Sequence, residues 1–363
     1  MAVTTAIVGL GIMGRRMLEH MLRHPGFAPD LLWDPSAEAR AAAAAIHPAG
    51  RIRASAEEAM AEADLVYLAC PPAPRKALAL KAAEAGRAVF LEKPLGVDVA
   101  ESEDLVARLD GLSARAAVNF TQAAGPALGR TVAAARSGEM GALAGVDIVV
   151  TYPAWPRAWQ AAADWLRFRE EGGYVREVIS HFLFASERVL GPLALEAALP
   201  VYPADPALCE THVLARLRAT EGAAAGAVVS VLGAVGGAQP DRQEVTVTGA
   251  RQSRRLEDFY VDSVSDGGPF RPLGDGDEDP RAVNLRAQLD DLALMVRGEP
   301  NRLATPAEAL RVQKLVEAML RGVCAGAGGR GAPPEGQGGG ARRPPEGQAA
   351  AGSTPNTERA KTG

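Results

Sequence analysis

A glycine-rich segment near the N-terminus has the spacing that a backbone needs to bind a diphosphate. Gly9, Gly11 and Gly14 follow the pattern G-x-G-x-x-G, with Ile12 and Met13 before the last glycine. The first glycine permits a tight turn, the second lets the backbone approach a pyrophosphate, and the third lets a helix pack closely on a strand. N–H groups at the start of that helix attract phosphate oxygens. The segment predicts dinucleotide binding, and we expect Ile12 and Met13 to contact the cofactor as well.

An acidic residue closes the next predicted strand, where Rossmann domains recognise the adenosine ribose. Asp34 holds this position and is followed by Pro35 and Ser36. A carboxylate there hydrogen-bonds the ribose hydroxyls and repels a 2′-phosphate. We therefore expect NAD as the cofactor. NADP is the alternative, because Arg40 on the next predicted helix could reach a phosphate.

Glu177 and His181 are spaced for proton transfer. They are four residues apart, so on an α-helix they share one face, where a carboxylate can orient an imidazole or adjust its proton affinity. Phe182, Leu183 and Phe184 follow directly. The alternative is therefore a structural histidine on a half-buried helix.

Aromatic and basic side chains gather shortly before Glu177, and they suit the recognition of a ring or an anion. Indole faces beside arginines could hold a sugar ring, an aromatic acid or another ring-bearing anion, and a carboxylate could pair with Arg167 or Arg176. We predict substrate contacts for Trp155, Trp165, Arg167 and Arg176. A hydrophobic lid or a dimer contact is the alternative for each tryptophan. The segment contains three of the four tryptophans and two arginines: Trp155, Arg157, Trp159, Trp165 and Arg167.

The elements that must position these residues begin with an alternation of short apolar runs and helical spacing. Such alternation predicts an α/β fold with a doubly wound parallel sheet, the Rossmann domain, over residues 1–122. The predicted strands are 2–8, 31–33, 65–69 and 88–91, and the predicted helices are 15–23, 36–45, 55–62 and 74–85.

Strand patterns predominate after residue 122. We expect residues 123–324 to form an α+β substrate and oligomerisation domain with a large, mostly antiparallel open sheet. Its last helices are expected to pack back on the Rossmann domain. Thr305 followed by Pro306 marks the start of the second helix. The predicted strands are 145–151, 211–219, 225–232 and 244–248, and the predicted helices are 281–297 and 306–321.

Residues 325–363 are rich in Gly, Pro and Ala, and Pro-Pro-Glu-Gly-Gln occurs twice in them. Such a segment cannot bury enough apolar surface to offset its ordering entropy. We predict a disordered tail, with an interaction or tethering segment as the alternative.

Composition excludes several classes of protein. The chain has 47% hydrophobic and 23% charged residues and a net charge of −5 without a basic stripe, so nucleic acid is not expected as a partner. Its three cysteines lack metal-ligand spacing, so no metal site is predicted. The N-terminus shows no signal segment, and no apolar run is long enough to span a bilayer. We expect a cytoplasmic enzyme.

Two further motifs carry a family resemblance. Glu92-Lys93-Pro94 follows the fourth predicted strand, and Gly172-Gly173 precedes Glu177 and His181. With the glycine segment, these residues resemble the glucose-fructose oxidoreductase, inositol dehydrogenase and rhizopine catabolism family (Gfo/Idh/MocA). The resemblance covers roughly residues 2–322. It includes Cys70-Pro71-Pro72 and Leu303-Ala304-Thr305-Pro306.

The resemblance implies roles for individual residues. Lys93 is expected near the nicotinamide and the substrate, and His181 is expected as the acid/base, with Glu177 beside it. It implies hydride transfer between the nicotinamide and a carbonyl, a secondary alcohol or an imine of a small, anionic or sugar-like substrate. A homodimer or homotetramer assembled through the second sheet is also implied. Further cofactor contacts are expected from Cys70, Pro71, Glu92, Lys93 and Asn119.

Several positions depart from the family pattern. Glu177 stands where the family has aspartate, Ile179 replaces a small residue, and Arg176 replaces an aliphatic one. Arg75 lies near the place of a histidine that is often found after the Pro-Pro turn. These departures argue against a standard polyol pocket.

Other functions fit part of the pattern. The glycine segment also looks like the opening of β-hydroxyacid dehydrogenases, but their second domain is mostly helical. An enzyme that retains its NAD through an elimination or a glycoside hydrolysis, or a cofactor-binding sensor, would keep the same fold. A stoichiometric change in NADH would separate these from a dehydrogenase.

Overall fold

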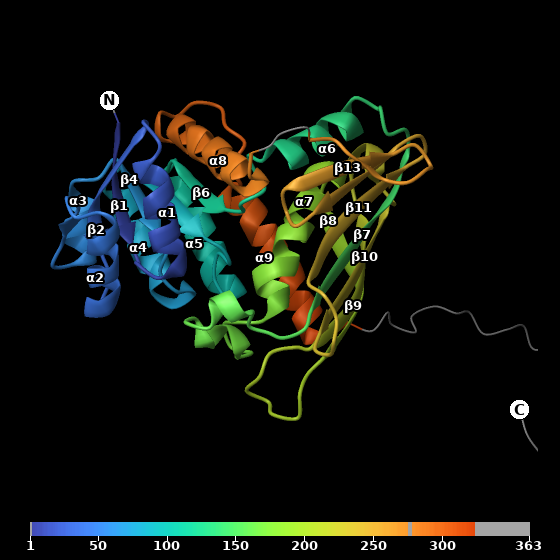
Figure 1. The fold of residues 1–363 in the computed structure, drawn as a ribbon, viewed down its shortest axis with the longest axis horizontal. Coiled ribbons are helices and arrows are strands. Elements are labelled where there is room, and N and C mark those ends of the chain that lie inside the picture. Colours follow the sequence, from blue (N-terminus) through green and yellow to red (C-terminus); the bar gives the residue numbers. More distant parts are fainter. Residues whose placement is uncertain (1, 275–277, 324–363) are drawn as a thin grey trace, which may run out of the picture. The chain divides into compact units, whose positions relative to one another are not determined.

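The computed structural model describes residues 2–274 and 278–323 (Figure 1). The predicted disordered tail, residues 325–363, lies outside the described residues. Both sheets fall within one compact unit. The division of the chain after residue 122 remains a prediction.

The N-terminal sheet has six parallel strands in the order β3-β2-β1-β4-β5-β6. The chain moves outward from β1 to β3 and then crosses back to β4, so the strand order reverses between β1 and β4. Ligands bind outside the carboxyl ends of strands at such a point. The strands are β1 Val3–Val8, β2 Phe27–Trp33, β3 Arg51–Ile52, β4 Leu65–Leu68, β5 Ala88–Glu92 and β6 Ala116–Asn119.

The helices of this region begin in two ways. The side chains of Ser36, Ser55 and Asp98 accept a backbone N–H at the starts of α2, α3 and α5. Helix α1 instead begins after Gly11, which has no side chain to act as a cap. The first N–H groups of α1 are therefore left for a ligand. The helices are α1 Ile12–Leu22, α2 Ala37–Ile46, α3 Ala56–Ala61, α4 Pro72–Glu84 and α5 Val99–Gly111.

The second sheet has eight strands in the order β14-β13-β12-β11-β7-β10-β9-β8. Only β7 and β10 pair in parallel, and the other neighbours are antiparallel. The predicted fold class, a Rossmann sheet followed by a mostly antiparallel open sheet, is confirmed. The strands are β7 Leu143–Tyr152, β8 Leu193–Val201, β9 His212–Ala219, β10 Val228–Val235, β11 Arg242–Gly249, β12 Ser253–Glu257, β13 Val261–Ser265 and β14 Arg271–Pro272.

The last helix lies between the two sheets. Helix α9 contacts α5 and β6 on one side and α7 and β8 on the other, and α8 contacts α1 (Figure 1). The start of α9 is capped as predicted, because Thr305 accepts the N–H of Glu308 and the Glu308 carboxylate accepts the N–H of Thr305. The helices of this region are α6 Pro126–Arg136, α7 Ser180–Leu190, α8 Pro280–Val296 and α9 Pro306–Arg321, and a π-helix spans Val175–Ile179.

Among residues 2–274 and 278–323, none of the helices combines the length and the apolar character needed to cross a membrane. No group of three or more His, Cys, Asp or Glu side chains in the same residues is arranged to hold a metal ion.

Candidate functional site

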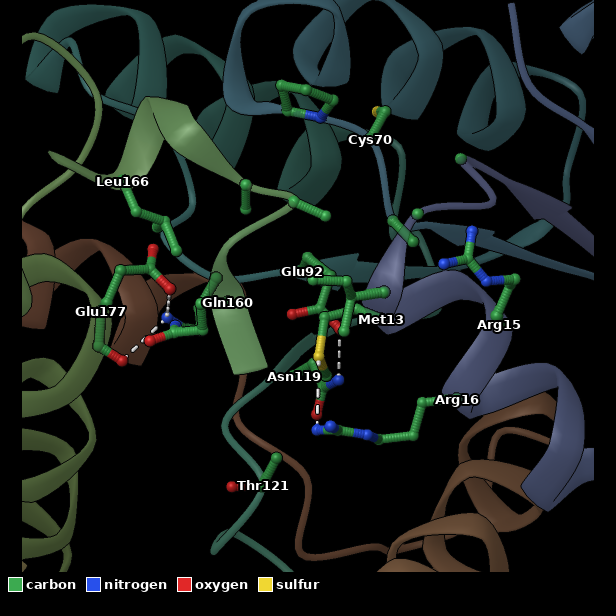
Figure 2. A pocket seen from close by; sticks show the side chains of 18 of the residues that line it. Met13, Arg15, Arg16, Cys70, Glu92, Asn119, Thr121, Gln160, Leu166 and Glu177 are labelled. Carbon is green, nitrogen blue, oxygen red and sulfur yellow. Dashed lines mark hydrogen bonds and ion pairs between the residues drawn. The ribbon is translucent and has the colours of Figure 1, made fainter. Parts of the chain in front are cut away.

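A cavity of about 1310 Å³ lies at the carboxyl ends of β1, β4 and β5 (Figure 2). Residues that follow the first sheet, from Arg157 to Arg281, form the rest of its lining. Its size exceeds that of a typical small-molecule pocket, as a dinucleotide together with a substrate would require. Ten of the eleven predicted cofactor residues line it: Gly9, Gly11, Ile12, Met13, Asp34, Cys70, Pro71, Glu92, Lys93 and Asn119.

Each glycine of the N-terminal segment is needed for a different reason. Gly9 has a φ of +98°, and a Cβ on it would lie 2.6 Å from the Cys70 nitrogen. A Cβ on Gly14 would overlap the carbonyl oxygen of Gly9, which explains why Gly14 supports the loop without lining the cavity. A Cβ on Gly11 would meet no atom within 4 Å and would take up free space beside the start of α1. This loop fits the pyrophosphate of a dinucleotide.

Asp34 lines the cavity just after β2, and two backbone groups hold its carboxylate. Its carboxylate accepts the N–H of Leu10 at 2.7 Å and the N–H of Ser36 at 2.8 Å. The guanidinium of Arg40 donates to the carbonyls of Asp34 and Pro35. The side chain that could have received a 2′-phosphate is therefore engaged by the backbone, and the carboxylate faces the cavity.

Replacement of Asp34 by alanine is expected to remove the preference for NADH over NADPH. The substitution removes both the acceptor for the ribose hydroxyls and the repulsion of a 2′-phosphate. We expect wild type to bind NADH more tightly and the variant to bind the two nucleotides within about threefold of each other, a difference below roughly 1 kcal/mol. Parallel calorimetric titrations measure this. An unchanged preference in the variant would contradict the role of Asp34.

Glu92 and Asn119 form a buried network beneath the cavity. The Glu92 carboxylate accepts a hydrogen bond from the Asn119 amide (Figure 2) and another from the Tyr67 hydroxyl. Gln288 on α8 donates to the Asn119 oxygen at 2.6 Å. Burial raises the pKa of Glu92, against the opposing effect of these donors. The network fixes the end of β5, from which Lys93 projects.

Arg75 joins two loops that line the cavity. Its buried guanidinium donates to the carbonyls of Cys70 at 2.6 Å and Glu92 at 2.7 Å, and also to the carbonyl of Pro94. One side chain therefore ties the Cys70-Pro71 turn to the Glu92-Lys93-Pro94 turn. This contact explains how the chain accommodates arginine near the position of the family's histidine.

Lys93 pairs with Glu177 across the cavity. The Nζ atom donates to the Glu177 carboxylate at 2.6 Å and to its backbone carbonyl at 2.9 Å (Figure 2). We expected Glu177 to orient His181, but no hydrogen bond joins them among the described residues. The reason is local: Val175–Ile179 is a π-helix, whose wider turn changes which residues share a face. Glu177 positions the lysine instead.

His181 is the second buried polar group at this end of the cavity. Its imidazole lies edge-on to the rings of Phe120 and Phe259, with ring centroids 5.5 and 5.4 Å away. Within the described residues, Nδ1 has no hydrogen-bond partner. Burial, followed by the charges of Lys93 and Arg157, holds the pKa of His181 well below its usual value. The imidazole is therefore neutral near pH 7 and can accept a proton.

The Gly172-Gly173 pair lets the chain turn into the π-helix. A Cβ on Gly172 would overlap the Leu166 carbonyl, and Gly173 has a φ of +104°. A Cβ on Gly173 would also lie 2.6 Å from the carboxylate of Glu210, which accepts the N–H of Val175 at 2.9 Å. Glu210 therefore anchors the segment that carries Glu177, a role that no local sequence signal indicated.

Replacement of Glu210 by glutamine is expected to change the pH dependence of stability. Burial raises the pKa of Glu210 from its ordinary value of 4.5 to about 7. Between these values the folded chain keeps the proton and the unfolded chain loses it, so stability falls as pH rises. At about 1.4 kcal/mol per pKa unit, the ionisation costs on the order of 3 kcal/mol above pH 7.

The glutamine variant should lack this cost, because an amide oxygen still accepts the Val175 N–H without ionising. Urea unfolding of both proteins at pH 5 and pH 8 tests it. The variant should gain much more stability relative to wild type at pH 8 than at pH 5, because most of the ionisation cost arises above pH 5. A difference that does not vary with pH would refute the assignment.

Of the four predicted substrate residues, only Trp165 lines the cavity. The Trp155 indole donates to the Leu166 carbonyl at 2.9 Å and packs near Tyr152 and Tyr174. Arg167 is exposed and pairs with Asp164 at 3.1 Å. Trp155 and Arg167 therefore support the loop rather than facing the cavity.

Arg176 lies away from the cavity. Its buried guanidinium makes a bidentate ion pair with Glu317 of α9, at 2.7 and 2.9 Å, and donates to the carbonyls of Arg169 and Gly172. All of these acceptors come from the chain itself, because a buried guanidinium must be neutralised and hydrogen-bonded. Arg176 is therefore not among the residues that line the cavity.

Several cavity residues were not assigned a role from sequence. Two of them come from the segment after β7 that the sequence already marked by its tryptophans and arginines. The others come from α1, from the turn between β12 and β13 and from the start of α8, and only the fold brings all of these side chains together. They are Arg16, Arg157, Trp159, Tyr260 and Arg281.

Residues 3–120 match the model of a family described as an oxidoreductase family with an NAD-binding Rossmann fold. The predictions of an NAD-binding domain and of the family resemblance are confirmed. A search of the curated proteins returns no match.

Solved structures share the fold over almost the whole of their own length. The WlbA dehydrogenase from Bordetella pertussis, solved with NADH and UDP-GlcNAcA, is 21% identical with a TM-score of 0.73, covering 88% of this chain and 96% of its own. UDP-N-acetylglucosamine 3-dehydrogenase GnnA from Acidithiobacillus ferrooxidans is 17% identical with a TM-score of 0.71, covering 88% and 97%. GenD2 from gentamicin A biosynthesis, solved with NAD, is 19% identical with a TM-score of 0.72, covering 91% and 95%. At these identities the likeness establishes the fold.

Proposed function

The nucleotide-binding domain of this chain belongs to the Gfo/Idh/MocA family of oxidoreductases, and from that premise we propose that the protein is an NAD-dependent dehydrogenase or reductase. Its substrate is a small molecule with a secondary alcohol, a carbonyl or an imine. The observation that carries the proposal is that Lys93 and His181 line the same cavity as the glycine loop and Asp34. The dehydrogenase activities named for the structural relatives support it.

The chain's own residues would hold the cofactor and the substrate. The N–H groups at the start of α1 bind the pyrophosphate, Asp34 binds the ribose, and the loops after β4 and β5 enclose the other end. Bound NAD supplies the hydride acceptor or donor. The protein must then only orient the substrate and transfer one proton.

Lys93 and His181 have different roles at the substrate oxygen or nitrogen: one donates a hydrogen bond, and the other exchanges a proton. The Nζ of Lys93, positioned by Glu177, donates a hydrogen bond to that atom and stabilises negative charge on it. The neutral imidazole of His181 accepts the hydroxyl proton during oxidation and returns it during reduction. Its low pKa keeps it in the accepting form near pH 7.

A panel of alcohols tests the proposal. The protein is incubated with NAD and one candidate alcohol at a time, chosen from sugars, sugar acids, cyclitols and hydroxy acids. NADH formation is followed by absorbance, and the product is identified by mass spectrometry. One NADH formed per product supports a dehydrogenase. Product without net NADH would instead indicate an elimination or a glycoside hydrolysis. Failure to bind NADH at all would contradict the whole proposal.

We also propose self-association and a cytoplasmic location. Leu199, Leu214 and Leu232 are exposed and are neighbours across β8, β9 and β10, which gives the second sheet an apolar stripe. An exposed stripe of this kind favours burial against another copy of the chain. The mass in solution, measured by ultracentrifugation, tests whether the protein is a dimer or a tetramer.

A further inference from the structure

Three arginines from different parts of the chain line the cavity that also holds Lys93 and His181. Arg16 comes from α1, Arg157 from the segment after β7, and Arg281 from the start of α8. In Figure 2 the side chain of Arg16 extends from α1 toward the region of Asn119. None of the three belongs to the motifs that bind the cofactor.

The three guanidinium groups lie close together. Those of Arg16 and Arg157 contact the same indole, 5.2 and 4.9 Å from the centroid of Trp159. Arg16 and Arg281 line a second, small pocket together. The pKa of Arg16 is lowered, first by burial and then by the charge of Arg281, so these two also repel each other. Like charges gathered in a partly buried site are destabilising unless an anion neutralises them.

The donors of these arginines have few acceptors within the described residues. The guanidinium of Arg16 donates only to the sulfur of Met13, at 3.8 Å, and Arg157 donates from Nε to the amide oxygen of Gln160 at 3.2 Å. No carboxylate of the described residues lies within 4 Å of any of the three guanidinium groups. Lys93, in contrast, is paired with Glu177. The donors that remain belong to side chains that line the cavity.

We propose that the part of the cavity lined by Arg16, Arg157 and Arg281 is a subsite for an anionic group of the substrate, a phosphate or a carboxylate. The inference rests on the proposed dehydrogenase function, since it places the anion on the molecule whose alcohol, carbonyl or imine reacts. Planar guanidinium groups bind two oxygens of such an anion at once. Arg157 lines the same cavity as Lys93 and His181, so the anion would be bound in the cavity that holds the reacting group.

Anion binding to the protein saturated with NAD⁺ tests the subsite. Saturation fills the phosphate-binding loop of the cofactor, so that any further anion must bind elsewhere. Inorganic phosphate, inorganic pyrophosphate and acetate are titrated separately by calorimetry, which distinguishes a phosphate subsite from a carboxylate one. We expect saturable binding of at least one probe. Arg157→Gln and Arg16→Gln should each weaken it by about tenfold or more, as expected for the loss of a charge-assisted hydrogen bond.

Arg297→Gln is the matched control, because it makes the same charge change at an exposed arginine that pairs with Glu299 outside the cavity. It should bind the probe like wild type. Circular dichroism of each variant checks folding. If the probe displaces NAD⁺ instead of binding beside it, the arginines serve the cofactor and the proposal fails. The absence of saturable binding, or equal affinity in wild type and both cavity variants, would also overturn it.

The result is separable from the proposed function. If NADH does not bind, the dehydrogenase assignment fails whatever the anions do. If NADH binds and the anions do not, the dehydrogenase assignment stands and only the anionic substrate class is lost. Each failure therefore has its own signature.

Discussion

Lys93→Met is expected to lower the turnover number by about two to four powers of ten while leaving the affinity for NADH within a few-fold of wild type. Methionine keeps the length of the side chain but removes the charge and the donors that would reach the substrate. The turnover number is measured on the substrate found in the panel, and the affinity by calorimetry. Lys314→Met is the control, because Lys314 is exposed and pairs with Glu103 on the surface.

A second readout separates a role in the reaction from a structural one. The charge of Lys93 is one cause of the low pKa of His181, so removing it should raise that pKa. NMR titration of the imidazole resonances follows the change. A variant that turns over at the wild-type rate would show that Lys93 takes no part in the chemistry.

Gly11→Ala is expected to weaken NADH binding by about tenfold or more, a cost of roughly 1.4 kcal/mol or greater, without destabilising the fold. Its Cβ would meet no atom of the chain, so the fold should tolerate it, but it would enter the space that a pyrophosphate needs. Gly14→Ala should instead destabilise the fold, because its Cβ would overlap the carbonyl of Gly9. Overpacking there should cost about 1–3 kcal/mol of stability.

Thermal unfolding and NADH titration of both variants distinguish the two effects. The alanine at position 11 should leave the melting temperature near that of wild type and raise the dissociation constant. If it binds NADH as wild type does, no phosphate approaches Gly11. The loop would then have some other purpose.

Local patterns predicted most of the first sheet. The glycine spacing, the alternation of strands and helices, and Asp34 at the end of β2 depend on neighbours in sequence, and the structure has them in the predicted order. The second sheet was predicted less completely. Strand β8, Leu193–Val201, consists mainly of Leu, Ala and Glu, which favour helices, and its extended form depends on pairing with β9.

The errors at the site have a common physical cause. Arg176 was expected to contact substrate, but its partner, Glu317, lies 141 residues further along the chain. Glu177 was expected to contact His181, but the π-helix turns it toward Lys93. Charged side chains take the partners that the tertiary fold brings to them, and a single sequence does not show those partners. The same limit explains why Arg16 and Arg281 received no role.

The most direct test of the account is a fluorescence titration of the wild-type protein with NADH. Trp33, Trp159 and Trp165 line the cavity, so bound NADH should quench tryptophan emission and emit by energy transfer from these indoles. The account predicts saturable transfer, weaker in Trp159→Phe than in wild type. Absence of transfer at millimolar NADH would show that the cavity does not hold the dinucleotide, and the proposed dehydrogenase function would be wrong.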